Sequence, residues 1–422
     1  MQLPQMIEVE NRWPVSPALD IPATLRRQFA EQRILEKLAP GARVAVAVGS
    51  RGISNLRQIV SAVLQLLHEA GARPFIVPAM GSHGGATPEG QSKILAHYGI
   101  TRESMGVPFD DRMDVSLIGR SANGVDVFFS EAALSAEGLI VINRVKPHTD
   151  FSGELGSGIQ KMFAIGLGKQ KGASAIHAAA SRLGLEAVLR AVAAVGMRQT
   201  PVLGAVAIVE DQEHATAGLH VLRPENIVEE ERKLLVVARS LMPHLPFDEI
   251  DLLIIDCMGK NISGSGMDPN VIGRSVQGYS TSLVPGEKQA PRIHRIFVRE
   301  LTPESNGNAT GIGLADFTTA RTIARIDREA SYTNALTAVT PGSVKFPIYF
   351  DSDRECIERA ITSVALPEGT VPRVVRISST LSLRKAEVSE AYANDIPANP
   401  ILAVTRATQP WKFDAAGNLA PL

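Results

Sequence analysis

Apolar positions in the first half of the chain form short continuous runs that alternate with helically spaced segments. An apolar run covers 43–48, and the apolar residues of 54–71 then recur three or four positions apart. A second run, 74–78, leads into a glycine-rich loop. Thr87 can cap a helix that begins at Pro88, because its hydroxyl accepts hydrogen bonds from unpaired backbone amides. This alternation predicts βαβ units and a parallel sheet.

The alternation continues through both halves of the chain and is interrupted by the proline pair that ends at Pro246. Before Pro246 we predict further strands at 125–129, 138–143 and 205–209, with helices at 173–196 and 224–241. After it we predict strands at 251–256, 293–299 and 373–377, with helices at 316–326 and 353–365.

The chain is therefore expected to be an α/β protein of two α/β domains with mixed and parallel sheets and an active-site cleft between them. We place the N-terminal domain at 1–246 and the C-terminal domain at 247–398. Residues 399–422 form a tail that either packs back on the N-terminal domain or lies loose, because its periodicity does not decide.

Length and composition agree with this organisation and exclude several classes. A chain of 422 residues is too long for one ordinary core. A net charge of −1 gives no electrostatic footprint for nucleic acid or an anionic membrane. Two distant cysteines support neither a disulfide framework nor a thiolate metal site. Since no signal peptide or spanning apolar run is visible, we expect a cytoplasmic protein that binds no membrane or nucleic acid.

Three loops, 49–53, 81–87 and 143–161, each follow a predicted strand. Because ligands bind beyond the carboxyl ends of parallel strands, we expect these loops to meet at one site. Arg51 in the first loop can hold a carboxylate in bidentate fashion, or it is a surface arginine in a turn. His83 lies among glycines that permit close approach of a ligand, or it is a loop histidine bonded for shape.

The third loop and the helix after it carry three further candidates. His148, like His83, is either a residue that contacts a ligand or a loop histidine that is hydrogen-bonded for shape. Lys161 lies among small and apolar residues, where a desolvated amine has a lowered pKa and can form a covalent adduct. The alternative is a lysine that faces water, as we expect of Lys169 and Lys171. His177 in an alanine-rich segment suits a metal ligand, or it is a helix-surface or core histidine.

At these positions the chain resembles the nickel-dependent lactate racemase family of 2-hydroxyacid racemases and epimerases, over most of its length. In that family an arginine follows the first strand, as Arg51 does, and a histidine lies in a Gly-Ser/Thr-His loop, as His83 does. A second histidine precedes a glycine-rich stretch, which His148 matches. A lysine that carries the cofactor is followed sixteen residues later by a nickel-binding histidine, and Lys161 and His177 have that spacing.

The resemblance implies a nickel pincer nucleotide, pyridinium-3,5-bisthiocarboxylic acid mononucleotide nickel, attached covalently through Lys161 with its nickel bound by His177. It implies that Ser50, Gly156 and Gly158 lie against this nucleotide. Proteins of cofactor synthesis would be transient partners, and a homo-oligomer is left open. The cofactor carries the hard chemistry, whereas the protein supplies orientation and proton transfer.

The reaction implied is inversion of C2 of a 2-hydroxyacid through hydride loss and return. His83 and His148 would alternate as acid and base, since imidazole titrates near neutral pH. Arg51 would hold the substrate carboxylate.

In the second half the chain departs from the family pattern. Asp268, Asn270 and Arg274 lie where the lactate enzyme has a Tyr-Gln…Lys pattern, and they are candidates for binding a larger polar acid such as a sugar acid. The alternative is a glycine-rich turn without a ligand role.

Two other functions stay open. One is a zinc-dependent lyase or hydratase that uses His83, His148 and His177 as ligands, which is chemically sound but leaves Lys161 unexplained. The other is a non-catalytic homologue that binds a small acid. No GxSxG turn, HExxH motif or P-loop is present. Serine hydrolysis from such a turn, zinc proteolysis and P-loop nucleotide binding are therefore excluded.

Overall fold

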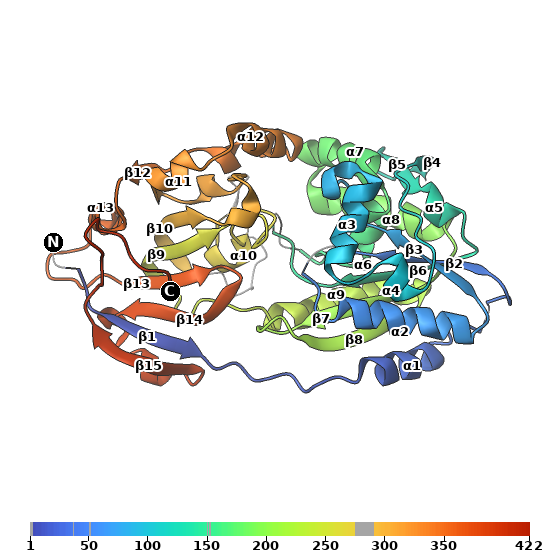
Figure 1. Cartoon of the computed structure of the whole chain (residues 1–422), viewed down its shortest axis with the longest axis horizontal. Helices are drawn as coiled ribbons and strands as arrows, with labels where there is room; N and C mark the ends of the chain where they lie inside the picture. Colours follow the sequence, from blue (N-terminus) through green and yellow to red (C-terminus); the bar gives the residue numbers. More distant parts are fainter. Residues whose placement is uncertain (1–2, 37, 50–51, 150, 152, 275–290) are drawn as a thin grey trace. The chain divides into compact units, whose positions relative to one another are not determined.

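The computed structural model describes residues 3–36, 38–49, 52–149, 151, 153–274 and 291–422. The chain divides into two compact units. The first unit is Val15–Met242, and the second unit combines Met1–Pro14 with Pro243–Leu422. Figure 1 labels the helices and strands of both.

The first unit is built on a five-stranded sheet in the order β3-β2-β6-β7-β8. Its first four strands are parallel and β8 is antiparallel at the edge. The strands are β2 (Arg43–Val48), β3 (Arg73–Pro78), β6 (Gly138–Arg144), β7 (Val202–Glu210) and β8 (Thr216–Leu222). A separate hairpin pairs β4 (Val115–Arg120) with β5 (Asp126–Ser130).

Helices cover both faces of this sheet, and the side chains of β2 show how. Val44, Val46 and Val48 join one buried cluster, whereas Ala45 and Ala47 join another, because successive side chains of a strand point to opposite faces. The first cluster receives apolar residues of α1 (Ile21–Glu31), α2 (Leu56–Glu69) and α3 (Pro88–His97). The second receives those of α5 (Glu131–Leu134), α6 (Ile159–Lys161), α7 (Lys169–Leu183), α8 (Leu185–Gln199) and α9 (Ile227–Ser240). A short helix, α4 (Arg102–Met105), follows α3.

The long helix predicted at 173–196 is two helices, α7 and α8. The break lies at Gly184, whose φ of 79° falls in the left-handed region that favours glycine. A π-helical turn, Met162–Gly166, connects α6 to α7. Such turns often occur at functional sites, and here the turn directly follows Lys161.

The second unit contains an eight-stranded mixed sheet in the order β12-β11-β10-β9-β13-β14-β1-β15. Its strands are β1 (Met6–Asn11), β9 (Glu249–Met258), β10 (Arg292–Leu301), β11 (Phe317–Thr319), β12 (Ile348–Phe350), β13 (Val374–Ser379), β14 (Ser382–Ser389) and β15 (Leu402–Gln409). Its helices are α10 (Pro269–Ile272), α11 (Ala320–Ala324), α12 (Arg328–Thr337) and α13 (Asp353–Val364).

The two ends of the chain differ from their predicted placement. Strand β1 pairs with β14 and β15, so the first residues join the second unit although the sequence placed them in the first. The tail 399–422 also belongs to the second unit, because β15 hydrogen-bonds to β1 instead of packing on the N-terminal domain. Pairing between distant segments has no signal in local periodicity.

The predicted α/β class with parallel and mixed sheets is confirmed, whereas the cleft between domains stays a prediction. The helix predicted at 316–326 is in fact a strand, β11, followed by the short helix α11. Among the described residues, no helix is long and apolar enough to cross a membrane.

Candidate functional site

Three of the loops chosen from the sequence follow neighbouring strands of the first unit. Strand β2 lies between β3 and β6, and all three run parallel. The segments after these strands therefore leave from the same edge of the sheet. The segments after β6 and β2 are in direct contact, since Arg144 Nη1 at the end of β6 donates to Gly52 O at 2.8 Å.

The closest pair among the candidates is Lys161 and His148. Lys161 Nζ lies 2.8 Å from His148 Nε2 and donates to Ser157 Oγ at 3.3 Å. Lys161 ends α6, and His148 lies in the loop after β6. The imidazole also stacks on the Phe151 ring, with centroids 4.4 Å apart and planes at 16°.

Burial and positive charge together keep His148 neutral. Its side chain is buried, and desolvation lowers its pKa well below the usual value, followed by the charges of Lys161, Lys146 and His177. A neutral imidazole next to an amine accepts a hydrogen bond through its unprotonated nitrogen. The neutral ring can thus accept a proton, although its lowered pKa makes it a weak base.

His177 lies half-buried on α7, close enough for its charge to affect His148. Within the described part of the chain, no three or more His, Cys, Asp or Glu side chains are grouped so that they could hold a metal ion. His83, His148 and His177 are all described and do not form such a group. The three-histidine zinc site therefore gains no support.

His83 lies in the loop between β3 and α3, on the edge that also carries His148. Its backbone N–H donates to Met80 O at 3.1 Å, and Thr87 caps α3 as predicted, accepting from Gly90 N. Gly81 N donates to Gly166 O at 3.1 Å, so the His83 loop lies against the π-helical turn that follows Lys161.

Ser50 and Arg51 lie outside the described residues, so their predicted roles stay predictions. The loop that follows them is held by an ion pair, Arg144 with Glu210. Arg144 Nη1 donates to Gly52 O at 2.8 Å, and Glu210 accepts from Ser54 N at 2.7 Å. Sequence reasoning missed this pair, although each residue directly follows a predicted strand.

Close packing within the protein explains why glycine occupies the positions of Gly156 and Gly158. A Cβ at Gly156 would lie 2.3 Å from Lys146 O, and one at Gly158 would lie 1.9 Å from Glu231 Oε1. A side chain at Gly156 would meet backbone, and one at Gly158 would displace the buried Glu231 carboxylate, so neither glycine needs a nucleotide to explain it. Their predicted contact with the cofactor stays a prediction.

Glu231 on α9 is a buried carboxylate that sequence reasoning missed. Its Oε2 accepts from the Gln160 backbone N–H at 3.0 Å and from Gln160 Nε2 at 3.1 Å. Its Oε1 is buried and has no hydrogen-bond partner among the described residues. Burial raises the pKa of Glu231 to about 7, with the hydrogen bonds from Gln160 opposing. The residue it holds immediately precedes Lys161.

Lys169 contradicts the expectation that it faces water. Its side chain is 0% exposed, and burial lowers its pKa to about 8. Lys171, by contrast, is exposed as expected and lies over the Phe128 ring at 4.3 Å. A fully buried lysine is rare, and neighbouring small residues gave no warning of it.

The predicted substrate residues of the second unit form local structure. Asp268 caps α10, and its Oδ1 accepts from the Asn270 backbone N–H at 2.9 Å and from Asn270 Nδ2 at 3.0 Å. Arg274 pairs with Asp316 at 2.7 Å and donates to Leu314 O at 2.8 Å. Each side chain thus has a structural role without a ligand.

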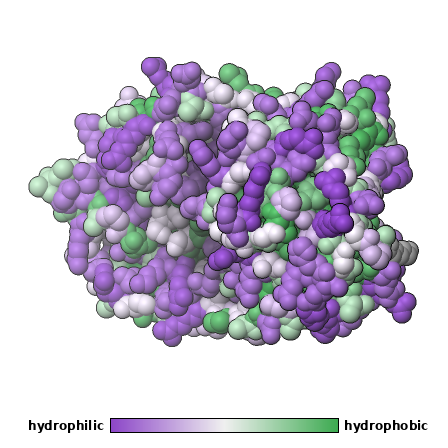
Figure 2. All heavy atoms as spheres, turned by 45° about the vertical axis from the view of Figure 1, so that its right-hand side comes forward, coloured by the Kyte–Doolittle hydropathy of each residue, from purple (hydrophilic) through white to green (hydrophobic). Residues whose placement is uncertain are grey.

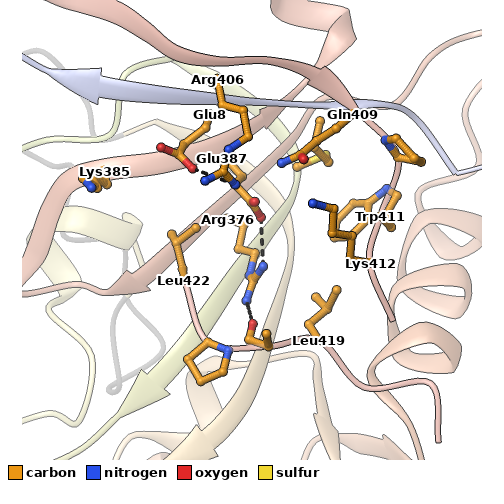
Figure 3. Close-up of a pocket in the computed structure, with 14 residues that line it drawn as sticks. Glu8, Arg376, Lys385, Glu387, Arg406, Gln409, Trp411, Lys412, Leu419 and Leu422 are labelled. Atoms are coloured by element: carbon orange, nitrogen blue, oxygen red, sulfur yellow. Dashed lines mark hydrogen bonds and ion pairs between the residues drawn. The ribbon is translucent and has the colours of Figure 1, made fainter. Parts of the chain in front are cut away.

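The second unit also contains a cavity of about 360 Å³ that includes none of the candidate residues. Figure 3 shows its arginines directed at carboxylates, Arg376 at Glu387 and Arg406 at Glu8. Lys385 and Lys412 also line the cavity, so its lining keeps two basic side chains besides the paired arginines. Figure 2 shows a mostly hydrophilic surface with smaller hydrophobic areas among the polar side chains.

Residues 6–188 match the family model described as the lactate racemase N-terminal domain. This segment belongs to the lactate racemase family. The match includes His83, His148, Lys161 and His177, so the resemblance seen in the sequence is confirmed at the level of the family. Among curated proteins, none matches the chain.

A solved structure supports the same fold. The lactate racemase apoprotein from Thermoanaerobacterium thermosaccharolyticum superposes with a TM-score of 0.55 at 14% identity, covering 90% of this chain and 99% of that one. At this identity the likeness shows the fold. The lactate racemase architecture thus extends beyond the matched domain into the second unit.

Proposed function

We propose that this lactate racemase family protein inverts C2 of a 2-hydroxyacid, as a racemase or epimerase. The observation that supports this most is the 2.8 Å contact between Lys161 Nζ and His148 Nε2. It joins the residue proposed to anchor the cofactor to a residue proposed to move a proton. The family match over 6–188 supports the class of reaction.

The cofactor that we propose is the nickel pincer nucleotide, held covalently by Lys161 Nζ and through nickel by His177. When bound, it supplies the hydride acceptor and donor. Because it brings carbon and sulfur donors of its own, it needs a single protein ligand to nickel. The described residues offer no grouped donor set, which fits a cofactor of this kind better than a bare zinc ion.

His148 then accepts the hydroxyl proton of one enantiomer, and His83 serves the other. Inversion needs a base on each side of C2, since the proton must leave as the carbon is oxidised and return as it is reduced. Burial keeps His148 in the neutral form that can accept a proton. Arg51 fixes the substrate carboxylate in this proposal.

Attachment at Lys161 also tunes His148. The positive charge of Lys161 lowers the His148 pKa, second only to burial. An acylated Nζ carries no charge, so attachment raises the pKa of His148 towards the range in which a histidine exchanges protons efficiently. His148 thereby becomes a stronger base only after the cofactor is in place.

The test is production of the protein together with the cofactor-synthesis proteins, followed by intact mass, nickel content and chiral analysis. We expect a nucleotide-sized adduct on the Lys161 peptide, one nickel per chain and loss of optical purity in at least one acid. The substrates should include lactate and sugar acids, because Asp268 and Arg274 are occupied locally and no longer favour a large acid.

Lys161→Ala is expected to lose adduct, nickel and activity together, whereas Lys171→Ala keeps all three. His83→Ala and His148→Ala should keep nickel but not invert. An unmodified, nickel-free wild-type chain, with a control racemase loaded in the same cells, would reject the cofactor proposal. A loaded chain that inverts no acid would leave the small-acid-binding alternative.

A further inference from the structure

Lys169 poses a problem that the proposed reaction does not solve. Its side chain is 0% exposed, yet among the described residues no carboxylate lies within ion-pair distance of it. A buried ammonium is costly, and here burial lowers its pKa to about 8, although the charges of Asp111 and Asp110 oppose the shift. An apolar side chain of similar length would fill the same space without that cost.

The ammonium differs from an apolar side chain in the two hydrogen bonds that it donates. Lys169 Nζ donates to Pro78 O at 2.7 Å and to Gln91 Oε1 at 3.2 Å. Pro78 is the last residue of β3, the strand from which the His83 loop leaves. Gln91 lies on α3, the helix to which that loop leads. Lys169 therefore connects both ends of the His83 loop to the start of α7.

Gln91 continues the connection into the loop itself. Its side chain is also 0% exposed. Its Nε2 donates to Gly81 O at 2.9 Å and to His83 O at 3.4 Å. The orientation of the amide follows from these partners, because its oxygen faces an ammonium and its nitrogen faces two carbonyl oxygens. One buried chain of hydrogen bonds thus runs from Lys169 through Gln91 to the His83 backbone.

We propose that Lys169 and Gln91 are positioning residues that fix His83 relative to the segment carrying Lys161 and His177. Lys169 begins α7, the helix on which His177 lies, and follows the turn after Lys161. The inference rests on the proposed function for its catalytic consequence. Displacement of a catalytic group by about 1 Å can cost roughly 100-fold in rate.

The decisive variant is Gln91→Glu. Its carboxylate still accepts from Lys169, whose opposite charge offsets part of the cost of burying it. It cannot donate to Gly81 O or His83 O, so the loop loses its anchor. Lys169→Met removes the ammonium from the same network, and Lys171→Met is the matched control on the exposed side of α7.

In the loaded enzyme, Gln91→Glu and Lys169→Met should keep nickel and the Lys161 adduct. Their kcat should fall roughly 10- to 100-fold with little change in KM. The kcat–pH profile should shift relative to that of the wild type, because the proposed base His83 is displaced. Lys171→Met should match the wild type in every measurement.

In the cofactor-free protein, amide hydrogen exchange at Gly81, His83 and Ala86 should accelerate severalfold in both variants. This readout does not depend on turnover, so it separates failure of this inference from failure of the proposed function. Wild-type exchange and an unshifted pH profile in a folded Gln91→Glu variant would overturn the positioning role. Loss of nickel together with activity would equally overturn it, in favour of a role in loading.

Discussion

The most deeply buried charges are handled in opposite ways in the two units. In the second unit Asp256 accepts from Arg299 Nη1 at 2.9 Å and from Arg376 Nη2 at 2.8 Å, and Arg299 also pairs with Asp353 at 2.9 Å. In the first unit Lys169 and Glu231 are as deeply buried, but the groups that hydrogen-bond to them are neutral.

The difference shows what each kind of buried charge does. A network of opposite charges satisfies itself and holds strands β9, β10 and β13 to helix α13. A single charge with neutral partners costs stability, and both of these lie directly beside segments that carry candidate catalytic residues. We therefore expect that removing a buried charge lowers the free energy of unfolding in the second unit and raises it in the first.

The largest effect is expected for Asp256→Ala. It leaves Arg299 and Arg376 buried with an unbalanced positive charge, which should reduce the free energy of unfolding by about 3–5 kcal/mol in denaturant titrations. Glu31→Gln, which removes the exposed pair Arg27–Glu31, should change it by less than about 1 kcal/mol. Equal effects of the two variants would show that the buried network is not a structural element.

Glu231→Gln should raise the free energy of unfolding instead of lowering it. The pKa of Glu231 is raised from 4.5 to about 7, so between these values the unfolded chain ionises while the folded one stays protonated. Wild-type stability should therefore fall as pH rises from 4.5 to 7, by up to roughly 3 kcal/mol relative to the variant. Unfolding at a series of pH values measures this difference, and parallel curves would contradict it.

Lys169→Met should show a smaller change at alkaline pH. The pKa of Lys169 is lowered from 10.5 to about 8, so the folded chain loses its proton first. Wild-type stability should rise relative to the variant between pH 8 and 9.5, by about 2 kcal/mol. The Lys171→Met variant provides the baseline, because Lys171 is exposed. A difference that is constant with pH would mean that Lys169 keeps its proton in the folded chain over this range, so that burial does not lower its pKa.

The smallest effect is expected on the pKa of one residue, His148, instead of on the stability of the fold. Lys161→Met removes the nearest positive charge from His148, so the His148 pKa should rise but stay below its usual value, since burial is the larger cause. Titration of the ring signals by NMR measures it. An unchanged pKa would remove the proposed coupling between cofactor attachment and base strength.

Several parts of the site were predictable because their signal is local. Strand runs such as 43–48 and 138–143 and the cap at Thr87 depend on neighbours in sequence, and the structure has β2, β6 and α3 there. The spacing of Lys161 and His177 indicated the family, which the match over 6–188 confirms. Burial of Lys169 had no such signal, because its cover comes from α3 and the end of β3.

Periodicity, glycine loops and motif spacing are properties of short segments. They were enough to predict the α/β class, the main strands of the parallel sheet and the family to which the candidate residues point. Three outcomes became visible only in the folded chain: β1 and β15 pair in the second unit, His148 contacts Lys161, and Glu231 and Lys169 are buried. These outcomes depend on contacts between residues far apart in the chain, and no local pattern encodes which distant segment excludes water from a given side chain.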